Sequence, residues 1–238
     1  MFPYGGRRLY PAPAGQRHAH EQLQVLTMTK INSNVAPHID MEYESRLYPD
    51  YPDKVNQALD RLKAGRTGGQ LLDNLASLSR NGKKVTIRPT TGSATTRAAL
   101  TEAQQASRPR IAGDDRDPLH NKAAVTLAQP RFFGRIKGSG ARAIVHWNPD
   151  QSLDVDEQGR VSSSNDESRS YLVLGHELVH ANRILKGTYT GGSGDRYDPA
   201  TPAAREERRA IGIGEFDGKT PSENSIRQEH GEPLRKKY

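Results

Sequence analysis

The chain has 238 residues and a formal net charge of +7, and 33% of its residues are hydrophobic. It is long enough for one domain with a core, but too short for two full-sized domains. No window approaches roughly 18 consecutive apolar residues, which excludes a membrane-spanning helix. The absence of cysteine excludes disulfides, thiolate metal ligands and a cysteine nucleophile.

Residues 1–50 mix Pro, Gly, Gln and His without sustained periodicity, and we interpret them as a mobile leader in front of a single domain over 51–238. No apolar run of signal-peptide length follows the early basic pair, so the sequence predicts no export by the general secretory route. The basic residues are scattered in short clusters such as "NGKKVTIRP", "RFFGRIKG" and "LRKKY". This scatter argues against nucleic-acid binding, although the charge favours acidic partners.

Two apolar runs at helical spacing predict a helical pair after the leader, the first formed by Val55, Leu59 and Leu62 and the second by Leu71, Leu75 and Leu78. The segments "KKVTIRP" and "GARAIVHWNPD" read as strands, and the sequence also allows a helix from Arg97 to Gln105. We expect Trp147 in the core. The strand around it is also one place where a substrate peptide could add as an extra strand.

The stretch "LGHELVHANRILKG" predicts a helix with two histidines one turn apart. Ser164 and Glu167 match a capping box at its start, and Gly187 is suited to its end. His176 and His180 lie about 40° apart around such a helix, away from its apolar stripe, so both imidazoles can meet one metal ion.

Two neutral imidazoles hold zinc without cancelling its charge, and zinc lowers the pKa of a bound water towards about 7. Glu177, directly after His176, is close enough to reach that water without entering the coordination sphere. It is the candidate general base that takes the proton and later delivers it to a leaving amine.

A catalytic zinc needs a third protein ligand, and "DPATPAAREERRAIGIG" offers one. Thr201 is a candidate N-cap with Pro202 at the first helical position, and Gly212 is the expected stop. Neighbouring helical residues point about 100° apart, so only one of Glu206 and Glu207 can bind the ion, while the other can hydrogen-bond a ligand histidine.

Other ligands stay open at this stage. His146, in the second strand, and His230, beside Gly231, are alternatives to a glutamate as third ligand. The zinc could also be structural, closed by a fourth protein ligand, although a glutamate directly after the first histidine favours catalysis.

The segment "EERRAIG" resembles the glutamate helix of clostridial neurotoxin light chains, zinc proteases of the gluzincin kind in which the first glutamate of the pair binds zinc. That resemblance selects Glu206 as ligand and leaves Glu207 beside it. From about Pro52 to the end, the chain resembles the type III secreted effector proteases that include NleD of enteric bacteria and HopH and XopG of plant pathogens. The resemblance rests on "LGHELVHANRILKG", "GDRYDP", "EERRAIG" and "PSENSIRQEHGEPLRKKY".

This resemblance implies a zinc endopeptidase that the bacterial type III secretion machinery delivers into the host cell cytoplasm, where it cleaves host protein. The enteric branch is associated with cleavage of mitogen-activated protein kinases in the activation loop, which makes such a kinase a candidate substrate.

Peptide hydrolysis builds negative charge on the carbonyl oxygen, so a donor is expected beside the zinc. Tyr197, in a Gly-rich loop, and Arg227 are the candidates. The alternatives are that Tyr197 only anchors its loop and that Arg227 forms a salt bridge with Glu223 one turn away.

The sequence thus predicts an α+β domain with a mainly helical N-terminal half, a small mixed sheet, an active-site helix and a glutamate helix. The leading hypothesis is a zinc metallopeptidase with His176, His180 and Glu206 as ligands, Glu177 as base, and no membrane association. The second is a basic adaptor that binds host protein or nucleic acid without catalysis, with an affinity that survives metal chelation.

Overall fold

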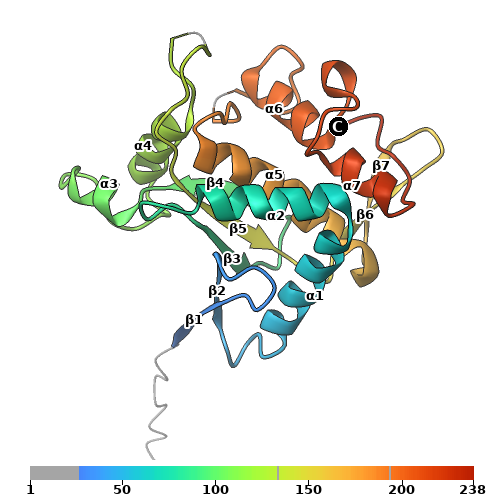
Figure 1. Ribbon diagram of the computed structural model, residues 1–238, viewed down its shortest axis with the longest axis horizontal. Helices are drawn as coiled ribbons and strands as arrows, with labels where there is room; N and C mark the ends of the chain where they lie inside the picture. The colour runs from blue at the N-terminus through green and yellow to red at the C-terminus, as the bar shows by residue number, and fades with distance from the viewer. Residues whose placement is uncertain (1–26, 133, 193) are drawn as a thin grey trace, which may run out of the picture.

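The computed structural model describes residues 27–132, 134–192 and 194–238, and this part of the chain forms an α+β domain (Figure 1). Its main sheet has five strands in the order β1-β2-β3-β5-β4. The central strands β2, β3 and β5 are parallel, and the outer strands β1 and β4 are antiparallel to their neighbours. The strands are β1 (Met28–Asn32), β2 (Ile39–Glu44), β3 (Val85–Pro89), β4 (Thr95–Ala99) and β5 (Arg142–Trp147).

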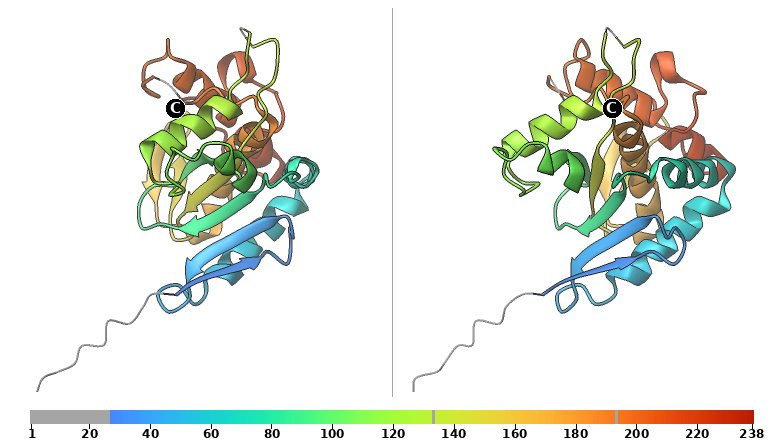
Figure 2. Two further views of the ribbon diagram at one scale, coloured as in Figure 1. Left: turned by 90° about the vertical axis from the view of Figure 1, so that its left-hand side faces the viewer. Right: turned by 60° about the vertical axis from the view of Figure 1, so that its left-hand side comes forward.

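A separate hairpin of β6 (Ser152–Val155) and β7 (Val161–Ser164) follows β5. The helices α1, α2 and α5 lie on one face of the main sheet, and α6 and α7 pack against α5 (Figures 1 and 2). The helices are α1 (Tyr51–Ala64), α2 (Arg66–Leu78), α3 (Glu102–Ala106), α4 (Pro118–Ala128), α5 (Ser170–Lys186), α6 (Pro202–Ile211) and α7 (Glu223–Glu229), with short 3-10 helices at Glu167–Arg169 and Gly214–Phe216.

Alternation along β5 gives the sheet two different faces. Ala143, Val145 and Trp147 point to the helices and join the hydrophobic core. Arg142 and His146 lie on the opposite face and are only partly buried. The indole of Trp147 donates a hydrogen bond to the carbonyl of Ser170 at 3.1 Å, which ties β5 to the start of α5 and confirms Trp147 as a core residue.

The helical pair is confirmed as α1 and α2, and both predicted strands are present as β3 and β5. The leader prediction was too long, because β1 and β2 fall within residues 1–50 and β2 pairs with β3 through Ile39 and Val85. The leader residues 1–26 lie outside the described part. Two strands at this point also make the N-terminal half mixed rather than mainly helical.

The helix allowed from Arg97 to Gln105 is wrong. Its first residues belong to β4, and only Glu102–Ala106 are helical. Two adjacent β-branched residues, Thr95 and Thr96, favour the strand. The Thr101 side chain then accepts a hydrogen bond from the Gln104 backbone, and this capping box begins α3.

The strand proposed as a site for substrate addition, β5, is interior, because it is paired with β3 on one side and β4 on the other. The edge at that end of the sheet is β4. Among the described residues, no helix is long and apolar enough to cross a membrane.

Candidate metal centre

The active-site helix α5 begins at Ser170, later than predicted. Ser164 ends β7, and Asp166 caps the following 3-10 helix by accepting a hydrogen bond from the Ser168 amide at 2.9 Å. The capping box at Ser164 and Glu167 is therefore wrong, because strand pairing holds Ser164. The predicted end is confirmed, since Gly187 is left-handed with φ 77° and closes the helix.

Helix α5 is covered on nearly all sides. Its apolar stripe is fully buried, and even His176 and His180 are only 9% and 5% exposed, because α6 and α7 pack over them. A helix so enclosed places its polar side chains in a low-dielectric environment, where each of them needs a partner.

Helix α6 begins and ends as predicted. The Thr201 hydroxyl accepts a hydrogen bond from the Ala204 amide, Pro202 occupies the first position, and Gly212 is left-handed with φ 85°. The helix contacts α5, and it thereby brings its pair of glutamates to the two histidines.

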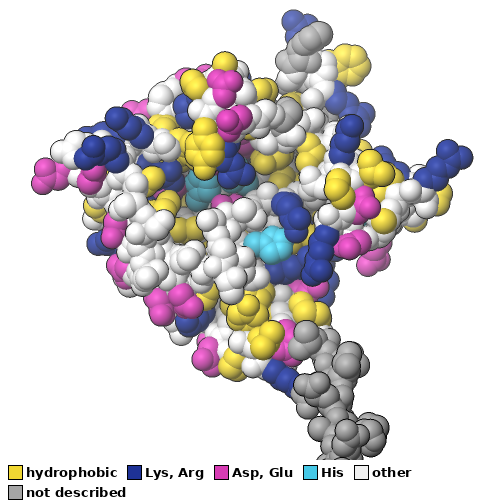
Figure 3. Space-filling view, turned by 180° about the vertical axis from the view of Figure 1, so that it is seen from behind, with side chains coloured by type: hydrophobic (Ala, Val, Ile, Leu, Met, Phe, Trp, Pro, Cys, Tyr) yellow, Lys and Arg dark blue, Asp and Glu magenta, His cyan; other side chains and the backbone are white. Residues whose placement is uncertain are grey.

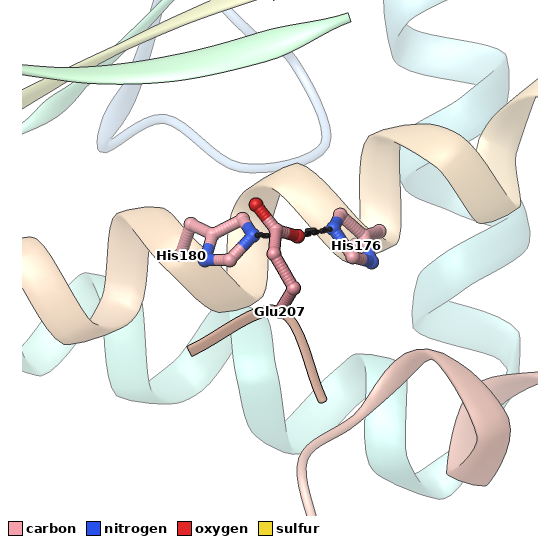
Figure 4. A group of neighbouring side chains, drawn as sticks. All are labelled: His176, His180 and Glu207. Carbon is pink, nitrogen blue, oxygen red and sulfur yellow. Dashed lines mark hydrogen bonds and ion pairs between the residues drawn. The ribbon is translucent and has the colours of Figure 1, made fainter. Parts of the chain in front are cut away.

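The carboxylate that meets both imidazoles is that of Glu207 (Figure 4). The Nε2 atoms of His176 and His180 are 3.1 Å apart, and Oε2 of Glu207 lies 3.3 Å from each. These three atoms form a nearly equilateral triangle of possible ligand atoms.

The triangle fits zinc. Ligands at about 2.0–2.1 Å from a tetrahedral ion lie about 3.3 Å from one another, which matches its three edges. If both imidazoles are neutral with their protons on Nδ1, two lone pairs face each other at 3.1 Å, an arrangement that a cation between them stabilises. The three donors leave room for a fourth position, as in catalytic zinc sites.

Glu206 does not take the position expected for it. Its Oε1 pairs with Nε of Arg183 at 2.5 Å, and its Oε2 accepts a hydrogen bond from the Thr190 hydroxyl at 2.6 Å. Oε1 of Glu206 also lies 3.7 Å from Nδ1 of His180. This distance is too long for a hydrogen bond, but it is short enough for the carboxylate to favour the protonated form of the imidazole. The rotation of about 100° between neighbouring helical residues separates the two glutamates, and Glu207 takes the position of the possible third ligand.

A second buried carboxylate lies behind the other histidine. Oε2 of Glu223, the first residue of α7, is 3.0 Å from Nδ1 of His176. Arg227 and Arg235 bind the same carboxylate at 2.8 and 2.7 Å. The Glu223–Arg227 salt bridge, which the sequence offered as an alternative role for Arg227, is confirmed. Glu223 could not be predicted as the partner of His176, because nothing in the sequence connects α7 with α5.

The charges of this cluster are strongly coupled. Burial lowers the pKa of His180, but Glu206 and Glu207 outweigh burial and raise it to about 10. Burial raises the pKa of Glu206, but His180 and Arg183 lower it to about 2. The carboxylates therefore stay ionised and favour positive charge between the imidazoles, whether as protons or as a metal ion.

Glu177 faces a cleft beside the histidines. Its Oε2 accepts a hydrogen bond from the Thr96 hydroxyl of β4 at 2.7 Å. The cavity has a volume of about 220 Å³, and its walls include Glu207, Tyr189 and Tyr238. Figure 3 shows the molecule from this side, with a histidine at the bottom of a hollow.

The other predicted site residues lie elsewhere. Tyr197 is 76% exposed, and its ring packs beside that of Tyr238 with centroids 5.5 Å apart, outside the cavity wall. Arg227 is 1% exposed and donates from Nε to Glu223 and from its other nitrogens to the carbonyls of Pro233 and Leu153, so it supports His176 indirectly through Glu223. His146 lies on the far face of the sheet and His230 packs against Tyr171, so neither belongs to the cluster.

A profile of the peptidase M91 family, described as "Effector protein", matches residues 39–238. The chain belongs to this family of peptidase effectors. Its glutamate-carrying helix and two-histidine helix both lie inside the matched region, as do β2 and the rest of the sheet except β1. No curated protein sequence matches the chain significantly.

Two solved structures are similar to this M91 peptidase. The catalytic domain of Clostridium botulinum neurotoxin serotype F has 11% identity and a TM-score of 0.40, over 69% of this chain and 42% of that chain. The light chain of botulinum neurotoxin serotype HA has 14% identity and a TM-score of 0.43, over 76% and 48%. The chain spans less than half the length of either structure.

Proposed function

We propose that this effector peptidase is a zinc-dependent endopeptidase in which His176, His180 and Glu207 hold the ion. The observation that carries the proposal is the triangle of Nε2, Nε2 and Oε2 atoms with edges of 3.1–3.3 Å. When bound, zinc would supply a Lewis acid that lowers the pKa of a water molecule towards neutrality.

Glu177 is the general base of this proposal. The Thr96 hydroxyl holds one of its oxygens at 2.7 Å, which fixes the carboxylate beside the ligand triangle. From there it accepts a proton from the attacking water and transfers it to the amine that leaves. The Thr96 hydroxyl also lies 3.0 Å from the Glu177 carbonyl oxygen, so its single proton is shared between the backbone and the side chain of the base, and β4 contacts both.

The substrate would add to the edge strand β4 rather than to β5. Residues Ser93 to Thr96 line the cleft, so a peptide paired with this edge passes directly over Glu177. Strand pairing of this kind recognises the backbone of the substrate and does not need its N- or C-terminus. It therefore suits an endopeptidase, which cleaves within a chain.

Tyr189 and Tyr238 replace Tyr197 and Arg227 as candidates for stabilising the oxyanion. Both line the cleft, and the ring of Tyr189 lies 6.0 Å from that of His180. Burial and the nearby carboxylates raise the pKa of Tyr189, and burial and Glu207 raise that of Tyr238 to about 12, so both phenols keep their protons and can donate.

Family membership supports a role as a secreted effector. On the resemblance to the NleD, HopH and XopG proteases, we propose delivery by a type III secretion system into the host cytoplasm and a host protein as substrate. A mitogen-activated protein kinase, cut in its activation loop, is the first substrate to test.

The deciding experiment measures zinc content and cleavage of purified kinases for wild type and Glu177→Gln. We expect about one zinc per chain in both proteins, and a cleavage rate at least about 100-fold lower in the variant. Glu167→Gln is the matched control, because Glu167 lies outside the cleft and should retain full activity. Zinc-free wild type after reconstitution would reject the proposal and favour the basic adaptor. Zinc-loaded protein that leaves the kinases intact would redirect the substrate search to other host proteins.

A further inference from the structure

Strand β4 separates two functional surfaces. Thr96 points to the helices and binds Glu177, whereas Arg97, the next residue, points to the opposite face of the sheet. On that face β4 lies next to β5, with Thr95 opposite His146 and Arg97 opposite Ile144. The edge that borders the cleft therefore also borders this second face.

Both signs of charge occur on and near this second face of β4: Arg97 lies on the strand, and Arg116 lies between Asp115 and Asp117 in the chain. Burial, together with the charges of Arg97, Arg88 and Arg116, lowers the pKa of His146 to about 4, whereas the charge of Asp115 acts to raise it. We call the surface formed by Arg97, Arg116 and His146 the basic face. Figure 3 shows Lys and Arg side chains around a histidine beside the hollow that contains another histidine.

The fold neutralises only part of this charge. Arg88 binds Asp115 at 2.9 Å and Glu42 at 3.1 Å, and Arg142 lies 3.9 Å from Asp115. Within 27–132, 134–192 and 194–238, no carboxylate lies within ion-pair distance of Arg97 or Arg116. Arg116 is exposed and Arg97 is half-buried, so both guanidinium groups can meet a partner from outside.

We propose that the basic face binds acidic side chains of the protein substrate, on the side of β4 away from the zinc ligands. The inference rests on the proposed function, because a peptide paired with the edge of β4 presents alternate side chains to the cleft and to the basic face. Arg97 and Arg116 then select substrates with Asp, Glu or phosphorylated residues at these alternate positions. They act in specificity and not in the chemical step.

The test is the affinity of a fluorescent glutamate-rich peptide for zinc-loaded Glu177→Gln protein, which binds without cleaving. In that background, Arg97→Gln combined with Arg116→Gln should weaken binding at least about fivefold, and added salt should reduce the difference. The same peptide with every Glu replaced by Gln should bind weakly to both proteins. Equal thermal midpoints show that the double variant is folded.

The matched control removes two cations from the α1–α2 junction, where Lys63 and Arg66 are exposed. Lys63→Gln with Arg66→Gln lowers the net charge equally and should leave binding unchanged.

An equal loss of peptide affinity in the two double variants would overturn the proposal, because the attraction would then depend on net charge alone. Unchanged binding in the Arg97 and Arg116 variant would also overturn it. A single-stranded oligonucleotide that binds more tightly than the peptide and depends on the same arginines would assign the face to nucleic acid. The assay measures binding and not cleavage. A failure of the proposed peptidase activity can therefore be distinguished from a failure of the proposed basic face.

Discussion

Oε2 of Glu223 lies 3.0 Å from Nδ1 of His176, so a carboxylate on α7 orients a histidine on α5 and leaves its Nε2 for the proposed zinc ion. Arg235 donates to the same oxygen and Arg227 to Oε1, so both arginines help to fix that carboxylate. Carboxylates in this position typically set the tautomer and the basicity of a ligand histidine.

Glu223→Gln should therefore weaken zinc binding about 10–100-fold. Competition with a chelator measures this affinity. Glu229→Gln is the matched control on the same helix, because Glu229 binds the Thr67 amide and hydroxyl at 2.8 and 2.7 Å, away from the histidines. The control should lose stability but keep its zinc affinity. Equal zinc affinity in wild type and Glu223→Gln would contradict the orienting role.

The two neighbouring glutamates of α6 should fail in different ways. Glu207→Ala removes a ligand atom and should leave little zinc after dialysis. Glu206→Ala should retain zinc at reduced affinity but lower the free energy of unfolding by about 3 kcal/mol, because it leaves Arg183 without its buried partner. Elemental analysis and urea denaturation separate the two effects. The reverse pattern would restore Glu206 as the ligand.

The roles of Glu206 and Glu207 could be predicted from the sequence only in part. Spacing alone predicted that only one of Glu206 and Glu207 can bind the ion, and in the structure only Glu207 lies close to both histidines. The choice depended on how α6 is rotated against α5, which is set by contacts such as the pair between Glu206 and Arg183. These contacts are long-range, so no local pattern reports them.

Local signals did predict the two helices that carry the candidate site. The glycine stops at Gly187 and Gly212 and the cap at Thr201 act within one turn, and all three are confirmed. A prediction was wrong where tertiary pairing overrode a local pattern. Ser164 matches a capping box in sequence, but strand pairing holds it in β7. The partner of His176 could not be found either, because Glu223 is distant in the chain and comes close only through the packing of α7 on α5.

Zinc binding should release protons. The pKa of His180, raised from 6.5 to about 10, means that the metal-free protein carries a proton there at pH 7, which zinc must displace. Apparent zinc affinity should thus rise with pH up to about 10, by about tenfold per pH unit for each proton released. Calorimetry in buffers of different ionisation enthalpy counts these protons.

The same shift sets the stability of the metal-free protein. A raised folded pKa stabilises the protonated form, so the contribution of His180 is complete below pH 6.5 and is lost as the pH rises towards about 10. Thermal unfolding of the metal-free protein at pH 7 and 10 should show this decrease. Pre-loading the protein with zinc should make this loss of stability between pH 7 and 10 smaller.

A zinc affinity that does not change with pH would contradict the predicted release of protons on zinc binding.

Tyrosine variants distinguish the two oxyanion donors proposed from the structure, Tyr189 and Tyr238, from Tyr197, which was predicted from the sequence. Tyr238→Phe and Tyr189→Phe each remove a hydroxyl from the cleft wall, and at least one should lower kcat about 100-fold with little change in zinc content. Tyr197→Phe is the matched control, because this residue is 76% exposed. Loss of kcat in Tyr197→Phe alone would show that its loop closes over the substrate.

Alanine substitutions of two adjacent glycines in α2 should change the free energy of unfolding in opposite directions. A Cβ on Gly68 would lie 2.0 Å from the carbonyl oxygen of Leu62, a backbone atom that cannot rotate away, so α1 and α2 would have to separate. Gly68→Ala should therefore lower the free energy of unfolding by about 1–3 kcal/mol. A Cβ on Gly69 would lie 3.5 Å from the Lys63 carbonyl oxygen, an ordinary contact. Gly69→Ala should raise stability by about 0.5–1 kcal/mol through helix propensity. Urea denaturation of the two variants measures both changes, and equal stability would show that the α1–α2 junction tolerates the added methyl group.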